Sequence, residues 1–279
     1  MNFKITYLIG ACLFFATAAH AQVDTIFTNN EKIACNVKEV TADAVKYVYP
    51  NEDVINTVYK NTIYKIAFKS GRTQTFAEQT NFKELKSVED FDMIAIAHVE
   101  AETNGLFKLD AVSAKAKGTT VYSSMTRVKE RAYKKLKICG AMNGANLIYL
   151  TQNLTEGNRY GSQYTPGSST ETNVAGVAYS NKLPNAKKFE TLTAGQKIFV
   201  ANVMYKLGDS DPDYTKSQTN VALEIQEVLN EGGLIFLVGK LDGEKTTKFR
   251  VSYLTDNSFS IVFKTKSAIY SYSFNVDAI

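Results

Sequence analysis

Histidine, tryptophan and cysteine are scarce in this chain of 279 residues, which has two histidines, three cysteines and no tryptophan. A Ser-His-Asp arrangement needs a histidine, and a zinc site needs several histidine or cysteine ligands at short spacing. The sequence also has no Gly-x-Ser-x-Gly turn, a common setting for a hydrolase nucleophile. We therefore expect a protein that is not an enzyme and that holds neither a metal nor another cofactor.

Long apolar runs are missing as well. No window reaches the roughly 18 apolar residues that a membrane-spanning helix requires, so we expect no transmembrane segment. At the start of the chain, Lys4 precedes a largely apolar stretch over residues 5–18, and Ala19-His20-Ala21 fits the small-x-small cleavage rule. These features predict a signal peptide over residues 1–21, cleaved near Ala21, and an exported protein that is periplasmic or extracellular. The alternative is a lipoprotein acylated at Cys12.

Neither sign of charge dominates the chain. The formal net charge is +4, and loss of Lys4 with the signal peptide lowers it to +3. This balance argues against nucleic acid as a partner and against an acidic tail. We expect a protein or glycan of the cell envelope or the extracellular space as the partner, and we leave homo-oligomerisation open.

The cysteines are too few for a disulfide framework. Only Cys35 and Cys139 follow the predicted signal peptide, and both stand in apolar patterns. We interpret them as buried free thiols. A single bridge between them is the alternative in an oxidising compartment.

Residues 22–78 have the pattern of an N-terminal β-meander. Three runs alternate apolar and polar residues, and turn-forming residues separate them, as at Pro50-Asn51 and Ser70-Gly71. Short strands at this spacing predict a small barrel or a curled sheet. The residues expected to share faces are Ile33, Cys35 and Val37, then Val45, Tyr47 and Tyr49, then Tyr64, Ile66 and Phe68.

Residues 90–182 predict an α/β domain with the order strand, helix, strand, strand. A polar linker over 79–90 precedes an expected strand from Asp92 to Glu100, and strands are also expected over 146–154 and 173–179. Ser123 or Ser124 is expected to cap the helix. Its apolar stripe recurs at spacings of three and four, at Met125, Val128, Ala132, Leu136 and Cys139.

Residues 192–279 predict a C-terminal antiparallel β domain of about six strands. Alternating patterns recur over 250–254, 258–263 and 270–276, and Gly232-Gly233 and Asp242-Gly243 are hairpin signals. With the other two segments, this makes the expected fold class α+β and mostly β.

The stretch GAMNGANLIYL, residues 140–150, crowds two glycines into one turn after the predicted helix. A phosphate-binding loop precedes its helix, where the helix dipole attracts anions, whereas these glycines follow the helix. We therefore interpret Gly140, Gly144 and Asn146 as a structural turn. The two glycines would allow a left-handed backbone at the end of the helix.

A family resemblance involves the same turn. The helix end KKLKICGAMNGANLIYL, a polar hairpin and the strand NVAGVAY together resemble the YbjQ-like superfamily, which includes the Rcs envelope stress-sensor lipoprotein domain. The resemblance covers about residues 90–181 and implies an exported domain that senses or binds other envelope proteins, with no catalytic residues. The chain departs from the stress sensor by lacking its multiple cysteines. The matching residues are Gly144, Ala145, Asn146, Val174, Gly176 and Ala178.

The polar loop over residues 157–171 is the best candidate binding element. It is long for a hairpin connection and carries Arg159, Tyr160 and Tyr164 among glycine and serine. Tyrosine in such a setting is typical of adaptable recognition, and a flexible decoration without function is the alternative. With so few apolar residues, the loop is expected to be mobile when it is free.

Two other features have ordinary interpretations. The carboxylates of Asp209, Asp211 and Asp213 resemble the opening of a calcium loop, but Tyr214 stands where such a loop needs glycine, so we expect a solvated hairpin loop. The basic residues of the predicted helix favour a solvated face, with an anionic surface as the alternative. These residues are Arg127, Lys129, Arg131, Lys134, Lys135 and Lys137.

Together these patterns favour a non-catalytic exported protein that binds a partner through sheet edges or through the Tyr160–Tyr164 loop. A small-ligand carrier is the alternative, because the C-terminal domain, loosely similar to lipocalin-like sheets, places four aromatic residues toward its interior. A hydrolase is the weaker alternative, because no second histidine follows the predicted signal peptide. His98 lies on the strand face of Ile94 and Ile96, and we interpret it as a structural or partly exposed strand residue. The four aromatic residues are Phe259, Phe263, Tyr272 and Phe274.

Overall fold

The structure is a computed structural model that describes residues 23–28, 32–76 and 83–276. Strands dominate it, so the expected α+β, mostly β fold class is confirmed. The predicted signal peptide and Cys12 lie outside the described residues. Within them, no helix has the length and apolar character needed to cross a membrane. The chain divides into two compact units, residues 1–77 and 78–279.

The first unit contains a six-stranded sheet in the order β4-β3-β2-β1-β5-β6, and all of its pairings are antiparallel. It departs from a simple meander because β5 pairs with β1. The carboxylate of Asp24, buried among the strands, accepts hydrogen bonds from the backbone N–H groups of Val37 and Lys69, each at 2.8 Å. The strands are β1 Asp24–Thr28, β2 Lys32–Val40, β3 Ala44–Val48, β4 Asn56–Tyr59, β5 Ile63–Ala67 and β6 Thr73–Thr75.

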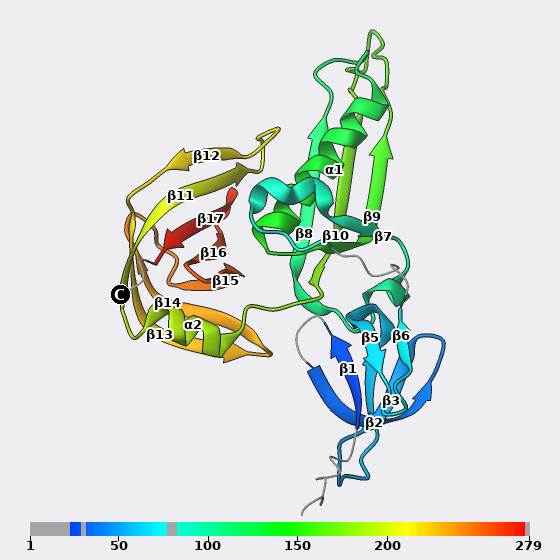
Figure 1. The fold of residues 1–279 in the computed structure, drawn as a ribbon. Helices are drawn as coiled ribbons and strands as arrows, with labels where there is room; N and C mark the ends of the chain where they lie inside the picture. Colours follow the sequence, from blue (N-terminus) through cyan, green and yellow to red (C-terminus); the bar gives the residue numbers. More distant parts are fainter. Residues whose placement is uncertain (1–22, 29–31, 77–82, 277–279) are drawn as a thin grey trace, which may run out of the picture. The chain divides into compact units, whose positions relative to one another are not determined.

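The second unit begins with a four-stranded sheet in the order β7-β9-β10-β8, in which only β7 and β9 are parallel. The helix α1, Met125–Met142, packs against this sheet (Figure 1). Short 3₁₀ helices over Val88–Met93 and Glu100–Thr103 flank β7. The strands are β7 Ala95–Ala97, β8 Phe107–Lys117, β9 Leu147–Glu156 and β10 Glu171–Ser180.

Two predictions for this sheet were wrong. The strand expected from Asp92 to Glu100 is reduced to Ala95–Ala97, because 3₁₀ turns take up both of its ends. The 11-residue strand β8 was not expected at all. Its sequence, FKLDAVSAKAK, is dominated by alanine and lysine, which have weak strand preference.

The predicted helix is confirmed, and Ser124 is its cap, since the Ser124 hydroxyl accepts a hydrogen bond from the N–H of Arg127. Val128, Ala132 and Leu136 form the buried stripe as expected. Met125 does not belong to it, because its side chain is 44% exposed at the first turn.

The turn after α1 is structural, but the two glycines differ from each other. Gly140 is helical, and a Cβ on it would lie 2.8 Å from Cδ1 of Ile148, so close packing rather than a left-handed backbone favours glycine there. Gly144 has a φ of +74°. The N–H groups of Gly144 and Ala145 donate to the carbonyls of Ala141 and Gly140, which is the hydrogen-bond pattern of a Schellman motif.

The second unit ends in a seven-stranded antiparallel sheet in the order β12-β11-β13-β14-β15-β16-β17, and pairing of β11 with β17 closes it into a barrel (Figure 1). The sheet has one more strand than expected. Both β12 and β13 pair with β11, at successive positions along it. The strands are β11 Ile198–Gly208, β12 Thr215–Gln218, β13 Ala222–Glu231, β14 Leu234–Leu241, β15 Lys248–Leu254, β16 Ser258–Lys264 and β17 Ala268–Asn275.

Aromatic side chains fill the interior of this barrel. Phe259 stacks on Phe274 at a centroid distance of 4.9 Å and meets Phe199 edge to face at 5.1 Å. The helix α2, Ala186–Thr193, which was not predicted, adds Phe189 to the same buried cluster. Phe263 and Tyr272 also belong to this cluster, so the four aromatic residues expected inside the domain do share one core.

The barrel and the central sheet share a second core. Tyr205, Leu207, Val262 and Ile269, on the outside of the barrel, pack with the buried residues of α1 and β8. The Arg250 guanidinium of β15 also donates to the backbone carbonyl and to Oδ1 of Asn143, at 3.0 and 2.7 Å. The end of α1 is thus the point where the central sheet and the barrel are joined.

Candidate functional site

Arg159, Tyr160 and Tyr164 lie at the end of the hairpin formed by β9 and β10. Arg159 and Ser168 form a two-way backbone bridge, with N–H to O distances of 2.8 and 2.9 Å, so the hairpin continues past the two strands. Arg159 pairs with Glu156 at 3.7 Å, but both side chains are more than half exposed, and such pairs add little stability. The predicted loop residues are therefore carried on an extension of the sheet.

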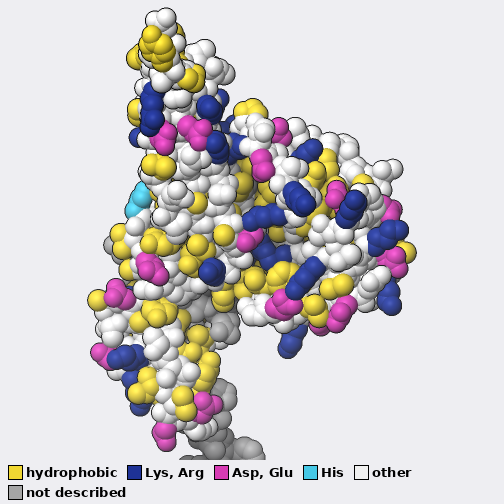
Figure 2. All heavy atoms as spheres, turned by 180° about the vertical axis from the view of Figure 1, so that it is seen from behind, with side chains coloured by type: hydrophobic (Ala, Val, Ile, Leu, Met, Phe, Trp, Pro, Cys, Tyr) yellow, Lys and Arg dark blue, Asp and Glu magenta, His cyan; other side chains and the backbone are white. Residues whose placement is uncertain are grey.

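A third tyrosine joins them from a separate loop. The rings of Tyr122 and Tyr160 lie 5.8 Å apart, and Tyr122, Tyr160 and Tyr164 are 80%, 70% and 88% exposed. We call these three residues the tyrosine tip. Figure 2 shows hydrophobic side chains gathered at this end of the hairpin. Tyr122 was missed in the sequence because it precedes α1 and reaches the tip only through the fold.

Polar contacts brace the backbone behind the tyrosine tip. The Asn158 amide donates to the carbonyl of Ser123 at 2.9 Å, and its Oδ1 accepts from the N–H and the hydroxyl of Thr170 at 2.7 and 2.9 Å. A Cβ on Gly161 would lie 2.7 Å from the nitrogen of Gly167, so the two arms cross where only glycine fits. Polar side chains thus supply contacts for a loop that has few apolar residues.

The basic residues of α1 are mostly used within the fold. Lys134 pairs with Asp213, the Lys135 ammonium donates to the carbonyl of Asp209 at 2.8 Å, and the Arg131 guanidinium donates to the carbonyl of Lys117 at 2.9 Å. This face of α1 therefore anchors the β11–β12 loop and the edge of β8. The sequence favours a solvated face here, and the structure shows instead that several of these basic side chains are bonded within the fold.

The acidic stretch over residues 209–213 forms the hairpin connection between β11 and β12, as expected. The Asp211 carboxylate accepts a hydrogen bond from the N–H of Gly208 at 3.0 Å, and Asp213 pairs with Lys134. No group of three or more potential metal ligands occurs among the residues that the structure describes.

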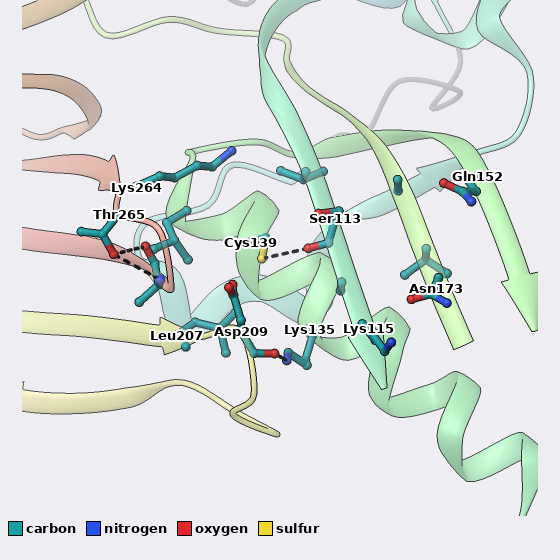
Figure 3. Close-up of a pocket in the computed structure, with 17 residues that line it drawn as sticks. Ser113, Lys115, Lys135, Cys139, Gln152, Asn173, Leu207, Asp209, Lys264 and Thr265 are labelled. Carbon is teal, nitrogen blue, oxygen red and sulfur yellow. Dashed lines mark hydrogen bonds between the residues drawn. The ribbon is translucent and has the colours of Figure 1, made fainter. Parts of the chain in front are cut away.

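A cleft of about 670 Å³ lies between β8, α1 and the near edge of the barrel (Figure 3). This volume is within the usual range for ligand sites. Polar and charged residues line it together with small apolar ones. The charged side chains around it are Lys115, Lys135, Asp209 and Lys264.

Lys135 differs from the other lysines of the cleft. Lys115 pairs with Glu171 and Lys264 with Asp110. Lys135 is only 5% exposed, and burial lowers its pKa from the ordinary value. Its ammonium bonds the Asp209 carbonyl but pairs with no carboxylate of the described residues, so it has donors to spare.

Neither cysteine is bridged in the structure, as the main interpretation expected, although Cys139 is only half-buried. Burial raises the pKa of the Cys139 thiol, which lines the cleft, to about 11, and burial also raises the pKa of Cys35 to about 11. Because the thiolate is the nucleophile, both groups are poorly reactive at neutral pH.

His98 is exposed on the surface (Figure 2).

Comparison with family models, with curated proteins and with solved structures gives no match. The geometry of the tyrosine tip and of the cleft therefore carries the functional argument. Sequence reasoning found Arg159, Tyr160 and Tyr164 from local composition. It missed Tyr122, Lys135 and the cleft, which are assembled from segments far apart in the chain.

Proposed function

We propose that this protein is an exported, non-catalytic binding module, which works in the periplasm or outside the cell and docks a protein partner through the tyrosine tip. The observation that carries the proposal is the exposure of Tyr160 and Tyr164 on a braced hairpin, together with that of Tyr122 beside it. The predicted signal peptide and the resemblance of residues 90–181 to YbjQ-like domains, which we also propose, agree with a role among envelope proteins.

Three exposed tyrosines have a clear physical use in binding. A tyrosine offers a large amphipathic surface, and only two side-chain torsions must be fixed when it is buried against a partner. Tyrosine is accordingly enriched among the residues that dominate binding energy at interfaces. The contacts of Asn158 hold the base of the loop, and preorganisation of this kind lowers the entropic cost of association even where the rest of the loop is mobile when free.

The carrier alternative receives less support. The barrel interior is occupied by Phe199, Phe259 and Phe274 in direct ring contact, with Phe189 of α2 against them. A barrel of so few strands has an interior that side chains fill. We therefore place the proposed binding surface on the outside of the fold.

The test is a triple variant with Tyr122→Ser, Tyr160→Ser and Tyr164→Ser. Wild-type and variant proteins are used as bait for capture from the envelope and secreted fractions of the source cells, and captured proteins are quantified by mass spectrometry. We expect the partner of the wild type to fall at least about tenfold in the variant, because each lost tyrosine removes interface contact. Stability should change by less than about 0.5 kcal/mol per site, since the rings are exposed.

A matched control carries Ile198→Ser, Val200→Ser and Val228→Ser, which remove exposed apolar side chains from the barrel at 58%, 55% and 47% exposure. This control should retain the partner. Equal capture by the wild type and the tyrosine variant would show that the tyrosine tip is not the docking surface.

A further inference from the structure

A short stretch of β8 has backbone groups without partners. β8 is an edge strand, and the N–H of Gly118 donates to the carbonyl of Thr170 at the end of its pairing with β10. Because hydrogen-bonded pairs alternate in an antiparallel ladder, the even-numbered residues bond β10 and the odd-numbered ones direct their backbone away from it. The outward residues from 111 onward are Ala111, Ser113, Lys115 and Lys117.

Side chains cover most of this edge. The Lys264 ammonium donates to the carbonyl of Ala111 at 2.7 Å, and the Arg131 guanidinium donates to that of Lys117 at 2.9 Å. The Cys139 thiol makes a weak contact with the carbonyl of Ser113 at 3.8 Å. Proteins commonly protect an exposed edge in such ways, since it is a template for pairing with another chain.

One place along the edge is left open. The helix α1 carries three side chains at four-residue spacing: Arg131, Lys135 and Cys139. Each step rises about 6 Å along the helix, which is close to the ~6.7 Å between alternate residues of a strand. Arg131 and Cys139 reach the β8 carbonyls on either side, but the ammonium of Lys135 donates to Asp209 of the barrel instead. The Lys115 carbonyl therefore receives no side chain from the helix.

Within residues 113–115 of the described chain, three backbone groups are thus unpaired: the N–H groups of Ser113 and Lys115, and the Lys115 carbonyl. They border the 670 Å³ cleft, whose floor contains Lys135 and Cys139 (Figure 3). The opposite wall is formed by the end of β11 and by the β16–β17 turn, including Leu207 and Ile269. The cleft is therefore a groove with a strand edge along one side.

We propose that this groove binds an extended peptide with an acidic side chain, which adds to the central sheet as a strand beside residues 113–115 of β8. Main-chain hydrogen bonds supply affinity in this mode of recognition, and alternate side chains of the peptide supply specificity. The two N–H groups donate to peptide carbonyls, and the Lys115 carbonyl accepts from a peptide N–H. Val112, Leu207 and Ile269 also line the groove, but they are only 3%, 3% and 6% exposed and belong mainly to the shared core.

The charge of the groove selects the acidic side chain. Only 5% of the surface of Lys135 is exposed, and no carboxylate of the described residues forms an ion pair with it. The charges of Asp209 and Asp211 act on Lys135 without a direct ion pair, and a carboxylate from a peptide would supply that pair as a charge-assisted hydrogen bond. This site is separate from the tyrosine tip, and its occupant is an extended segment rather than a folded surface.

A phage-displayed library of random heptapeptides, selected on the immobilised full chain, tests the proposal. Enriched peptides are synthesised, and their affinities for the wild type and for Ser113→Pro and Ser113→Ala variants are measured by calorimetry. Proline removes only an outward N–H at this edge position, so the β8–β10 ladder is kept. We expect Ser113→Pro to weaken binding about tenfold, whereas Ser113→Ala, which keeps the N–H, should change it less than about twofold.

Two further measurements keep the test decisive if Ser113→Pro does not fold. Methylation of single backbone nitrogens in the peptide should weaken binding to the wild type at one position on the strand and not at its neighbours. Lys135→Met should remove the advantage of acidic over neutral peptides, and the tyrosine variant should bind as the wild type does. Selection of no peptide that is sensitive to these changes would overturn the proposal. Enrichment of peptides without acidic residues would overturn its charge requirement.

Discussion

Replacing Gly144 with alanine is expected to lower the free energy of unfolding of the second unit by about 3 kcal/mol, from left-handed strain and from steric overlap together. The φ of Gly144 is +74°, a conformation that costs a residue with a Cβ about 1–2 kcal/mol. The added Cβ would also lie 2.4 Å from the backbone oxygen of Ser252 in β15. A backbone oxygen in a barrel strand cannot rotate away, so the end of α1 and the barrel must separate.

Gly232→Ala is the matched control. Its φ is +60°, and nothing lies within 4 Å of the position of its Cβ. Only the left-handed strain applies, so we expect a loss of about 1 kcal/mol. Urea unfolding followed by circular dichroism measures both variants. Equal losses at the two sites would mean that the close approach of Gly144 to Ser252 does not exist in solution.

Replacing Arg250 with methionine is the second large effect, with an expected loss of about 3 kcal/mol, because hydrogen bonds to a charged donor are worth about 1.5–3 kcal/mol each. The Arg250 side chain is 8% exposed, and burial lowers its pKa to about 10. Its guanidinium satisfies both the carbonyl and Oδ1 of Asn143, which is itself 2% exposed. Methionine keeps the apolar stem but leaves these two oxygens without that donor.

The control for Arg250 is Lys248→Met on the same strand. Lys248 pairs with Glu231 at 2.8 Å, and both side chains are about half exposed, so its loss should cost less than about 1 kcal/mol. Thermal unfolding gives the stabilities, and hydrogen exchange at Gly144 and Ala145 reports opening of the helix end. Protection of these amides that is unchanged in Arg250→Met would contradict the role of Arg250 in joining the sheet to the barrel.

The sequence predicted elements whose signals are local. The stripe at Val128, Ala132 and Leu136 identified α1, and the alternating aromatic residues identified β16 and β17. The strand β8 was missed because alanine and lysine give it no apolar alternation. The eight-residue helix α2 was missed because about two turns are too few to show a recurring apolar stripe.

Gly140 shows why side-chain packing could not be inferred from composition. Glycine near the end of a helix usually marks a left-handed residue, and Gly144 fits that rule. Gly140 is instead favoured by close packing, because a Cβ there would lie 3.1 Å from Cδ1 of Ile94, the residue before β7, and 2.8 Å from Cδ1 of Ile148 in β9. Local sequence does not reveal such a neighbour.

The candidate sites follow the same division. Arg159, Tyr160 and Tyr164 stand together in one loop, so composition was enough to single them out. Tyr122 joins them from 38 positions before Tyr160. The groove beside β8 combines a strand that was not predicted with a buried lysine and the edge of the barrel, and only the tertiary structure brings these parts together.

Site-specific photo-crosslinking tests the proposed docking surface most directly. A benzophenone amino acid replaces Tyr164 in one strain of the source organism and Ile198 in another, and both are irradiated in living cells. Both side chains are exposed, at 88% and 58%, but only the first belongs to the tyrosine tip. We predict one discrete adduct of a single partner from position 164 and none from position 198. No adduct at position 164, or the same adducts at both positions, would contradict a partner held at the tyrosine tip.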